Sequence, residues 1–209
     1  MKTANSLKIV LVSLAMFWGL GATAFGDFIV NGDMESNTEG VVNNWTLSSV
    51  DKNYPGAGEY TTDAYHSATH SLKLYNTTEG TGAKMYWTQI CENIEAGRTY
   101  TLSVYLKSDN VTGASAYLQV LFYNASNNLV AGYTASPSLT GTADWTYTSK
   151  TIEAPVGAVK AKILFGFYLT QGTAWADDIS FVPEPATAML CLCGTGLLIS
   201  RRLRKNKTL

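Results

Sequence analysis

The sequence is poor in cysteine. Cys191 and Cys193 lie in an apolar run near the C-terminus, so residues 27–182 hold a single thiol, Cys91. One thiol excludes an internal disulfide in that segment, and a lone cysteine of this kind is typically a small buried side chain. Cys191 and Cys193 are two residues apart, which is not the usual CxxC spacing of zinc ligands.

Motifs of enzymatic chemistry are also lacking. There is no GxSxG, no phosphate-binding glycine loop and no carboxylate pair that spacing alone singles out. The only histidines, His66 and His70, are four residues apart but lack the Glu of HExxH, which favours a solvated loop over a zinc site. Asp177 and Asp178 are adjacent in a predicted strand, so their side chains are expected on opposite faces. We therefore expect a protein that is not an enzyme.

Basic residues are scarce in the central segment. Residues 27–182 carry fifteen acidic and eight basic side chains, a net charge of −7. The tail beyond Val182 carries five cations against one carboxylate, Glu184. A segment with this excess of negative charge repels phosphate, which excludes a nucleic-acid partner.

The N-terminus has the three parts of a secretory signal peptide. Lys2 and Lys8 supply positive charge, residues 9–20 form an apolar run, and Ala22-Thr23-Ala24 supplies small residues for cleavage. A helix of that run is too short for a bilayer core of about 30 Å. The sequence predicts a signal peptide over 1–26 and export of the segment that follows.

Between residues 27 and 182 the apolar residues alternate with polar ones, and no helical stripe is sustained. Alternation over 98–107, 116–123 and 160–169 predicts strands with one buried face. Clusters of Gly, Pro, Asn and Ser separate these segments, as at 124–128 and 136–138. This pattern predicts an all-β sandwich. The inward side chains are expected to be Tyr100, Leu102, Val104, Leu106, Leu118, Val120, Phe122, Ala161, Ile163, Phe165, Phe167 and Leu169.

Several amphipathic side chains fall on the faces opposite the apolar ones. Sugar rings stack their C–H faces on aromatic rings while their hydroxyl groups bond to amides, so these side chains could form a carbohydrate platform. Scattered exposed tyrosines are also common on protein surfaces, and alternation does not tell whether the strands are neighbours. The candidate residues are Tyr105, Tyr117, Gln119, Tyr123 and Tyr168.

Two carboxylates are candidates for a metal site. Glu35 follows an Asn31-Gly32 turn, and Asp177 is expected on one face with Trp175, Ile179 and Phe181. A charge on an apolar face is costly unless it is compensated, and Ca²⁺ bound by oxygen ligands would compensate it. The spacing is equally consistent with a partly exposed Asp at a strand end.

Five segments, in order, resemble the carbohydrate-binding modules of families 4, 9 and 22. This resemblance implies a non-catalytic jelly-roll β-sandwich of the galactose-binding-like kind. It also implies one structural Ca²⁺, with Glu35 and Asp177 at the matching positions. Met34 stands where the family usually has Phe, a change that a core tolerates. The segments are FIVNGDMES, AYHSATHSLKLYN, QICENIEAGRTYTLSVYLKS, DWTYTSKTIEAPVGAVKAKILFGF and TAWADDISF.

The tail over 183–209 resembles the PEP-CTERM sorting signals of Gram-negative bacteria. Pro183, Glu184 and Pro185 precede an apolar transmembrane segment at 186–200, and a cluster of cations begins at Arg201 and Arg202. Such cations keep the C-terminus in the cytoplasm. The resemblance implies a C-terminal hydrophobic sorting helix, transient anchoring in the inner membrane and cleavage by an exosortase-type membrane protease. It implies a final place at the cell surface or in the extracellular matrix.

These observations predict a non-catalytic, exported carbohydrate-binding protein of the cell surface or exopolysaccharide matrix. Its expected partner is a polysaccharide, and the cell's own exopolysaccharide is one candidate. The alternative is a structural matrix or adhesion protein that makes protein contacts and binds no specific sugar.

Overall fold

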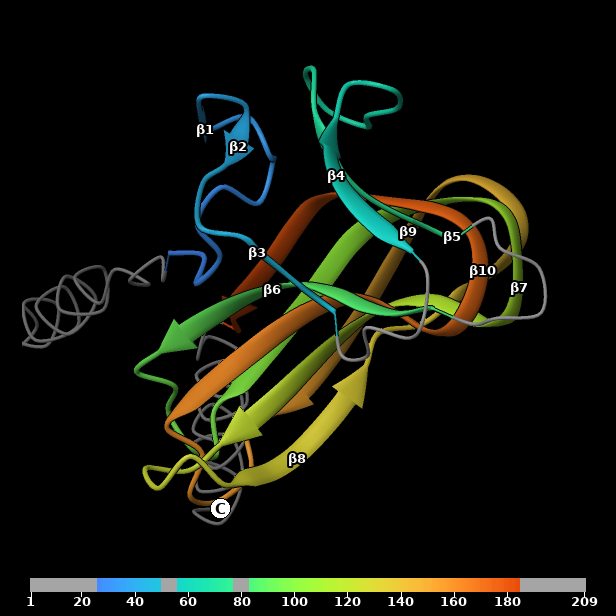
Figure 1. Ribbon diagram of the computed structural model, residues 1–209. Coiled ribbons are helices and arrows are strands. Elements are labelled where there is room, and N and C mark those ends of the chain that lie inside the picture. The colour runs from blue at the N-terminus through green and yellow to red at the C-terminus, as the bar shows by residue number, and fades with distance from the viewer. Residues whose placement is uncertain (1–25, 50–55, 77–82, 185–209) are drawn as a thin grey trace, which may run out of the picture. The chain divides into compact units, whose positions relative to one another are not determined.

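The computed structural model describes residues 26–49, 56–76 and 83–184, and these residues form ten strands (Figure 1). No helix in these ranges is long and apolar enough to cross a membrane. The predicted signal peptide and sorting signal lie outside them, except for Gly26, Pro183 and Glu184. The strands are β1 (Asn37–Thr38), β2 (Val41–Val42), β3 (Thr46–Ser49), β4 (Ala57–Thr61), β5 (Ser71–Asn76), β6 (Ala83–Glu92), β7 (Thr99–Tyr123), β8 (Leu129–Thr134), β9 (Leu139–Glu153) and β10 (Lys160–Pro183).

Two long strands, β7 and β10, organise the fold. They pair antiparallel along nearly their whole lengths, from Lys160 opposite Tyr123 to Pro183 opposite Tyr100. The first part of β10 also pairs with β6, and its second part pairs with β5. One layer therefore has the order β3-β6-β10-β7-β8, and the other has the order β4-β5-β10-β7-β9. Figure 1 shows β10 bending from one layer into the other.

The all-β prediction is confirmed, and so is the alternation that led to it. The inward side chains predicted for 98–107 and 116–123 expose no surface. These two segments, predicted as separate strands, are the two ends of the single strand β7. Tyr100 stacks on Phe181 with ring centroids 4.9 Å apart, and its hydroxyl accepts a hydrogen bond of 2.9 Å from the Glu95 amide. Its polar atom is thereby satisfied in the core.

Cys91 behaves as predicted for a lone buried thiol. It is only 2% exposed, and burial raises its pKa to about 12. The thiol therefore stays protonated at neutral pH and packs as a small apolar side chain.

Leu169 does not follow the predicted alternation. The other inward side chains of 160–169 are buried, but Leu169 is 42% exposed. The ladder between β10 and β6 shifts register between Tyr168 and Thr170, and Leu169 has a φ of +53°. A bulge of this kind inserts one residue and reverses the faces that follow. The prediction of an inward Leu169 was wrong because apolar character does not reveal the bulge.

The N-terminal segment is tied to the end of β10. The Phe28 amide donates to the Phe181 carbonyl at 3.0 Å, and the Ile179 amide donates to the Gly32 carbonyl at 2.9 Å. A Cβ at Gly32 would collide with the carbonyl oxygen of Ile179, so this close approach requires glycine. Met34, in the same turn, has no exposed surface. The turn thus holds the segment before β1 against the last strand.

Candidate functional site

Four of the five predicted platform residues lie on one side of one layer. Tyr117, Gln119 and Tyr123 point outward from the second part of β7, because they alternate with side chains that the core buries completely. Tyr117 is opposite Gly166 of β10, Gln119 is opposite Leu164, and Tyr123 is opposite Lys160. Tyr168 lies two residues beyond Gly166 on the same strand and is 47% exposed. We call this outward surface of β6, β7 and β10 the tyrosine face.

A glycine and an unpredicted tyrosine complete this face. Tyr86 of β6 and Tyr117 of β7 flank Gly166, which pairs with both. A Cβ at Gly166 would lie 2.5 Å from Cδ1 of Tyr86 and 3.2 Å from Cζ of Tyr117. The bare backbone of Gly166 therefore lets the two rings approach each other above β10. Burial raises the pKa of Tyr117, and the adjacent Tyr86 hydroxyl adds to this effect.

Sequence reasoning missed Tyr86, although a signal for it was present. Tyr86 lies between Met85 and Trp87, both of which are buried, so alternation places its ring outward. A glycine in the middle of the apolar strand 160–169 was a second signal, because such a glycine often marks a close approach.

The structure separates Tyr105 from the other four platform residues. β7 passes from one layer to the other, so Tyr105 pairs with Asp177 of β10 and Tyr147 of β9 in the second layer. Its ring stacks on His66 with centroids 3.6 Å apart and an interplanar angle of 12°. Trp145 meets His66 at an angle, with centroids 5.9 Å apart. Tyr105 thus belongs to a different aromatic cluster.

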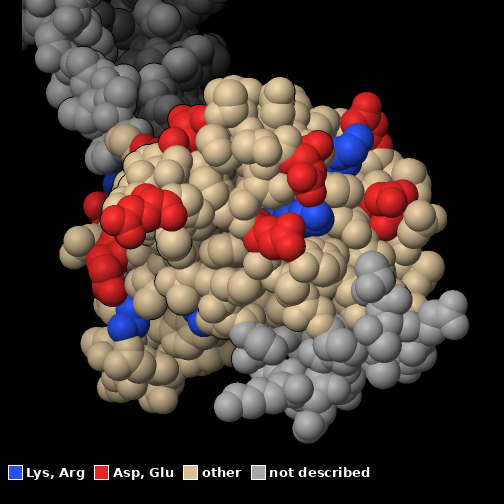
Figure 2. Space-filling view, turned by 45° about the horizontal axis from the view of Figure 1, so that its top comes forward, with Lys and Arg blue, Asp and Glu red and all other residues tan. Residues whose placement is uncertain are grey.

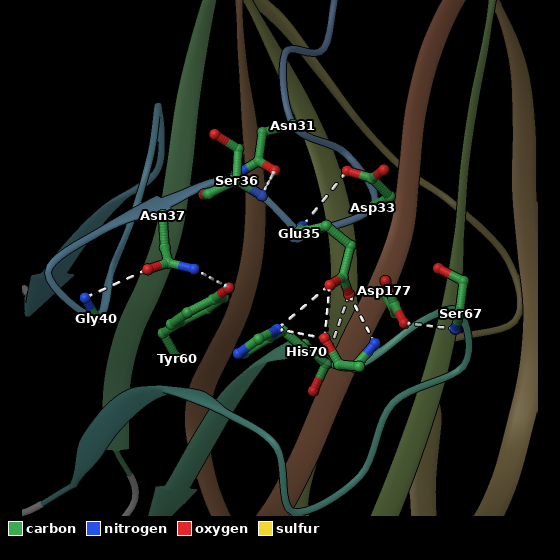
Figure 3. A network of polar contacts seen from close by, with 12 residues as sticks. Asn31, Asp33, Glu35, Ser36, Asn37, Gly40, Tyr60, Ser67, His70 and Asp177 are labelled. Atoms are coloured by element: carbon green, nitrogen blue, oxygen red, sulfur yellow. Dashed lines mark hydrogen bonds and ion pairs between the residues drawn. The ribbon is translucent and has the colours of Figure 1, made fainter.

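The loop between β4 and β5, residues 62–70, is held by carboxylates from two directions. Glu35 accepts hydrogen bonds of 2.9 Å from the amides of Thr69 and His70, and one of 2.7 Å from the Thr69 hydroxyl. Asp177 accepts hydrogen bonds of 2.8 and 2.9 Å from the amides of His66 and Ser67. Figure 3 shows Glu35 and Asp177 converging on this loop. The two predicted metal ligands therefore anchor one segment.

Two expectations for the Asp177-Asp178 pair were wrong. Asp178 has a φ of +51°, and the β7–β10 ladder shifts register between Asp177 and Ser180. Asp177 consequently shares the outward face of Trp175, whereas Ile179 and Phe181 point into the core. The bulge also brings both carboxylates to the same loop, because Asp178 lies 2.6 Å from Nδ1 of His66 and accepts a 2.6 Å bond from the Ser67 hydroxyl. Asp177 has no exposed surface, since the loop covers it.

The histidines contact carboxylates and aromatic rings, and His66 is exposed to solvent as the sequence predicts for this loop. His66 pairs with Asp178 and stacks on Tyr105. His70 lies 3.3 Å from the Glu35 carboxylate through Nδ1 and stacks on Tyr60 with centroids 4.5 Å apart. Each histidine therefore has a carboxylate partner and a stacked aromatic ring, and His66 also contacts Trp145.

The two anchoring carboxylates have opposite pKa shifts. Burial alone would raise the pKa of Glu35, but hydrogen bonds from Thr69 and His70 outweigh it and lower the pKa from 4.5 to about 2. Burial raises the pKa of Asp177 from 3.8 to about 6, against the lowering effect of three backbone amides. Glu35 therefore stabilises the folded protein above pH 4.5, whereas the contribution of Asp177 declines as the pH rises from 3.8 to about 6.

The chemistry of these carboxylates suits calcium, which prefers oxygen ligands. However, the N–H and O–H groups of the loop that donate hydrogen bonds to Glu35 and Asp177 already compensate their negative charge without an ion. Within the described ranges, no group of three or more His, Cys, Asp or Glu residues is arranged to hold a metal. Calcium at Glu35 and Asp177 stays a prediction.

No protein-family model matches the sequence, and no curated protein matches it. Its fold is similar to that of solved structures. One is the enzymatically active domain of tailspike protein 4 from bacteriophage CBA120, with a TM-score of 0.61 and 20% identity. That match covers 76% of this chain but only 21% of the tailspike chain.

Two further similar structures are carbohydrate-binding modules that the chain spans almost completely. TmCBM61, solved in complex with β-1,4-galactotriose, has a TM-score of 0.53 and 13% identity, covering 76% of this chain and 99% of the module. The CBM22-1 xylan-binding domain of Xyn10C from Paenibacillus barcinonensis has a TM-score of 0.53 and 14% identity, covering 79% and 99%. At these identities the likeness shows the fold alone.

The chain thus has an all-β fold that resembles the β-sandwich of carbohydrate-binding modules. The predicted resemblance to families 4 and 22 is confirmed at this level, whereas family 9 stays a prediction. Because the similar structures include both binding modules and an enzymatically active domain, the fold alone does not separate binding from catalysis.

The pKa of Glu35 leads to a test of the loop anchor. We expect Glu35→Gln to be less stable than the wild type at pH 6, with the difference shrinking as the pH falls from 4.5 toward 2. At low pH the Glu35 carboxylate of the wild type becomes protonated and loses its charge. The variant lacks this charge at every pH, so the stabilities of the two proteins converge. Melting temperatures of both proteins across this pH range would measure it. Glu153→Gln, at an exposed position on β9 away from the loop, is the matched control. A stability difference that does not change with pH would contradict the anchor.

Proposed function

We propose that this chain is a non-catalytic carbohydrate-binding protein with a jelly-roll sandwich, and that its tyrosine face binds a polysaccharide. The observation that carries the proposal is the arrangement of Tyr86 and Tyr117 around Gly166. Two rings brought together over a bare strand offer flat apolar surface to a sugar ring, while Gln119 beside them offers an amide for hydroxyl groups. The resemblance to binding modules supports the proposal, because two of the similar structures are named for galactotriose and xylan.

Variants of the tyrosine face test this function. We expect Tyr86→Ala and Tyr117→Ala each to weaken polysaccharide binding by about tenfold or more, as the loss of a central aromatic contact does in other interfaces. Gly166→Ala should weaken it too, because the new methyl group displaces both rings. Affinity electrophoresis against a panel that includes the native matrix measures the effect.

Tyr147→Ala is the matched control, since Tyr147 is 53% exposed and pairs with Tyr105 in the other layer. It should leave binding unchanged, and the melting temperature of every variant shows whether a loss of binding reflects a loss of folding. A wild-type protein that no glycan retards, the native matrix included, would end the proposal.

The alternative is a structural matrix or adhesion protein. The cluster of Tyr105, Trp145, Tyr147 and His66 favours it, because it places exposed aromatic surface on the layer opposite the tyrosine face. Self-association that sugars do not disrupt, combined with no glycan binding, would support this alternative.

We also propose that the protein is exported, transiently anchored in the inner membrane and delivered to the cell surface or matrix. The support is the sequence of residues 1–26 and 183–209. In addition, β10 ends at Pro183, so the last strand ends inside the Pro-Glu-Pro motif.

Processing has a direct test. Protein recovered from the cell surface is expected to lack residues 1–26 and to end near Pro185, because an exosortase-type protease would remove the tail. Mass spectrometry of its terminal peptides would show this. Recovery of surface protein that still ends at Leu209 would contradict removal of the tail.

Calcium is a separate proposal, with Glu35 and Asp177 as its carboxylate ligands. Chelator is expected to lower the melting temperature of the wild type, because an ion that binds only the folded state stabilises it, by about 2.7 kcal/mol at about 100 times the dissociation constant. The effect should be smaller in Glu35→Gln. A wild-type melting curve that chelator leaves unchanged would mean that the N–H donors alone compensate these carboxylates.

A further inference from the structure

The tyrosine face continues along β10 into a hollow that contains two lysines. This hollow has a volume of about 230 Å³. Lys160 and Lys162 are two residues apart on β10 and therefore point to the same side, as Leu164 and Gly166 do farther along the strand. Tyr123 is opposite Lys160, and Ile90 of β6 is opposite Lys162. The lining residues are Ile90, Tyr123, Asn127, Lys160, Ala161 and Lys162.

Lys160 and Lys162 differ from three other cations of the described ranges, which are paired, and from Lys150, which has no ion pair there either but is exposed. Lys73, Arg98 and Lys107 each lie within 3.0 Å of a carboxylate oxygen. Lys160 and Lys162 form no ion pair with any residue that the structure describes, although Glu92 is opposite Lys160 in the ladder. Both are half-buried.

These two half-buried cations thus have no ion pair among the described residues, although residues 27–182 carry a net charge of −7. Figure 2 shows the general pattern on one face of the molecule, where the red of Asp and Glu covers more of the surface than the blue of Lys and Arg. A neutral polysaccharide lying along the face would remove water from the two ammonium groups and give them no negative partner. Burying charge in that way costs free energy, whereas an anionic substituent at the same place would offset the cost.

We propose that the tyrosine face is specific for an acidic polysaccharide. Its sugar rings stack on Tyr86 and Tyr117, and a carboxylate carried by the chain lies at Lys160 and Lys162. This inference rests on the proposed function and adds the class of ligand. A nucleic acid fits less well, because double-stranded DNA carries about one charge per 1.7 Å and the net charge of −7 on residues 27–182 repels that density.

The experiment compares each acidic polysaccharide with its own carboxyl-reduced form, so that only the charge differs. The panel contains alginate, polygalacturonate and the native matrix polysaccharide, with single-stranded DNA as a competing polyanion. We expect the full-length wild type to bind at least one acidic member more tightly than its reduced form. The preference should decrease between about 0.01 M and about 0.15 M salt, because the Debye length falls from about 30 Å to about 8 Å.

Single substitutions assign the charge to the two lysines. Lys160→Gln and Lys162→Gln should each weaken binding of the acidic form by about two- to fivefold, the range of an exposed ion pair, and leave binding of the reduced form unchanged. Lys150→Gln removes the same charge from an exposed position on β9 and should change the binding of neither the acidic form nor the reduced form.

The outcomes separate the two proposals. Equal or tighter binding of the reduced forms, with Tyr117→Ala still harmful, would overturn the acidic ligand and leave polysaccharide binding intact. Lysine variants that bind the acidic form like the wild type would also overturn it. Binding of single-stranded DNA as tight as that of the acidic glycan would overturn it in favour of a general polyanion site. No binding to any member would overturn both proposals.

Discussion

The antiparallel ladder between β7 and β10 is the interaction on which the rest of the structure depends. It runs through both layers, and every other strand except the β1–β2 hairpin attaches to it directly or through one neighbour. Its inner side chains on β7, at alternate positions from Tyr100 to Leu106 and from Ala116 to Phe122, expose no surface and form the centre of the core. Because side chains alternate strictly along a strand, a buried inner row determines the outer row as well. The tyrosine face is the outer row of one half of this ladder.

The bend of the ladder also decides which aromatic residues meet. Tyr105 and Tyr117 lie on the same strand and both point outward, yet the change of layer between them places them in separate clusters. Where β10 loses register with β6, at Leu169, and with β7, at Asp178, a residue adopts a positive φ. The second irregularity is useful to the fold, because it directs Asp177 and Asp178 to one loop. That loop then covers Asp177, and its amides replace the water that the carboxylate loses.

Alternation in the sequence was sufficient to predict strand structure over 98–107, 116–123 and 160–169, most of their buried side chains, and the outward direction of four residues of the tyrosine face. It was not sufficient for Leu169 and for the faces of Asp177 and Asp178, because a bulge depends on the pairing of strands and not on the polarity of one segment. The separation of Tyr105 was hidden for the same reason. Tyr86 could have been found, since Met85 and Trp87 show the same alternation. Of the two alternatives for Asp177, the structure shows a buried side chain, but a loop distant in sequence covers it and its amides compensate the charge.

The charge distribution gives the proposed site a physical basis for selectivity. A segment at −7 repels acidic polymers in general, so a weak attraction at two lysines does not attract every polyanion. Stacking on Tyr86 and Tyr117 alone would accept many sugars, because an aromatic ring recognises a flat apolar surface and little else. Only a polysaccharide that offers sugar rings to the tyrosines and a carboxylate to Lys160 and Lys162 gains from both interactions. Selectivity in this arrangement comes from repulsion by the surrounding surface as much as from attraction within the site.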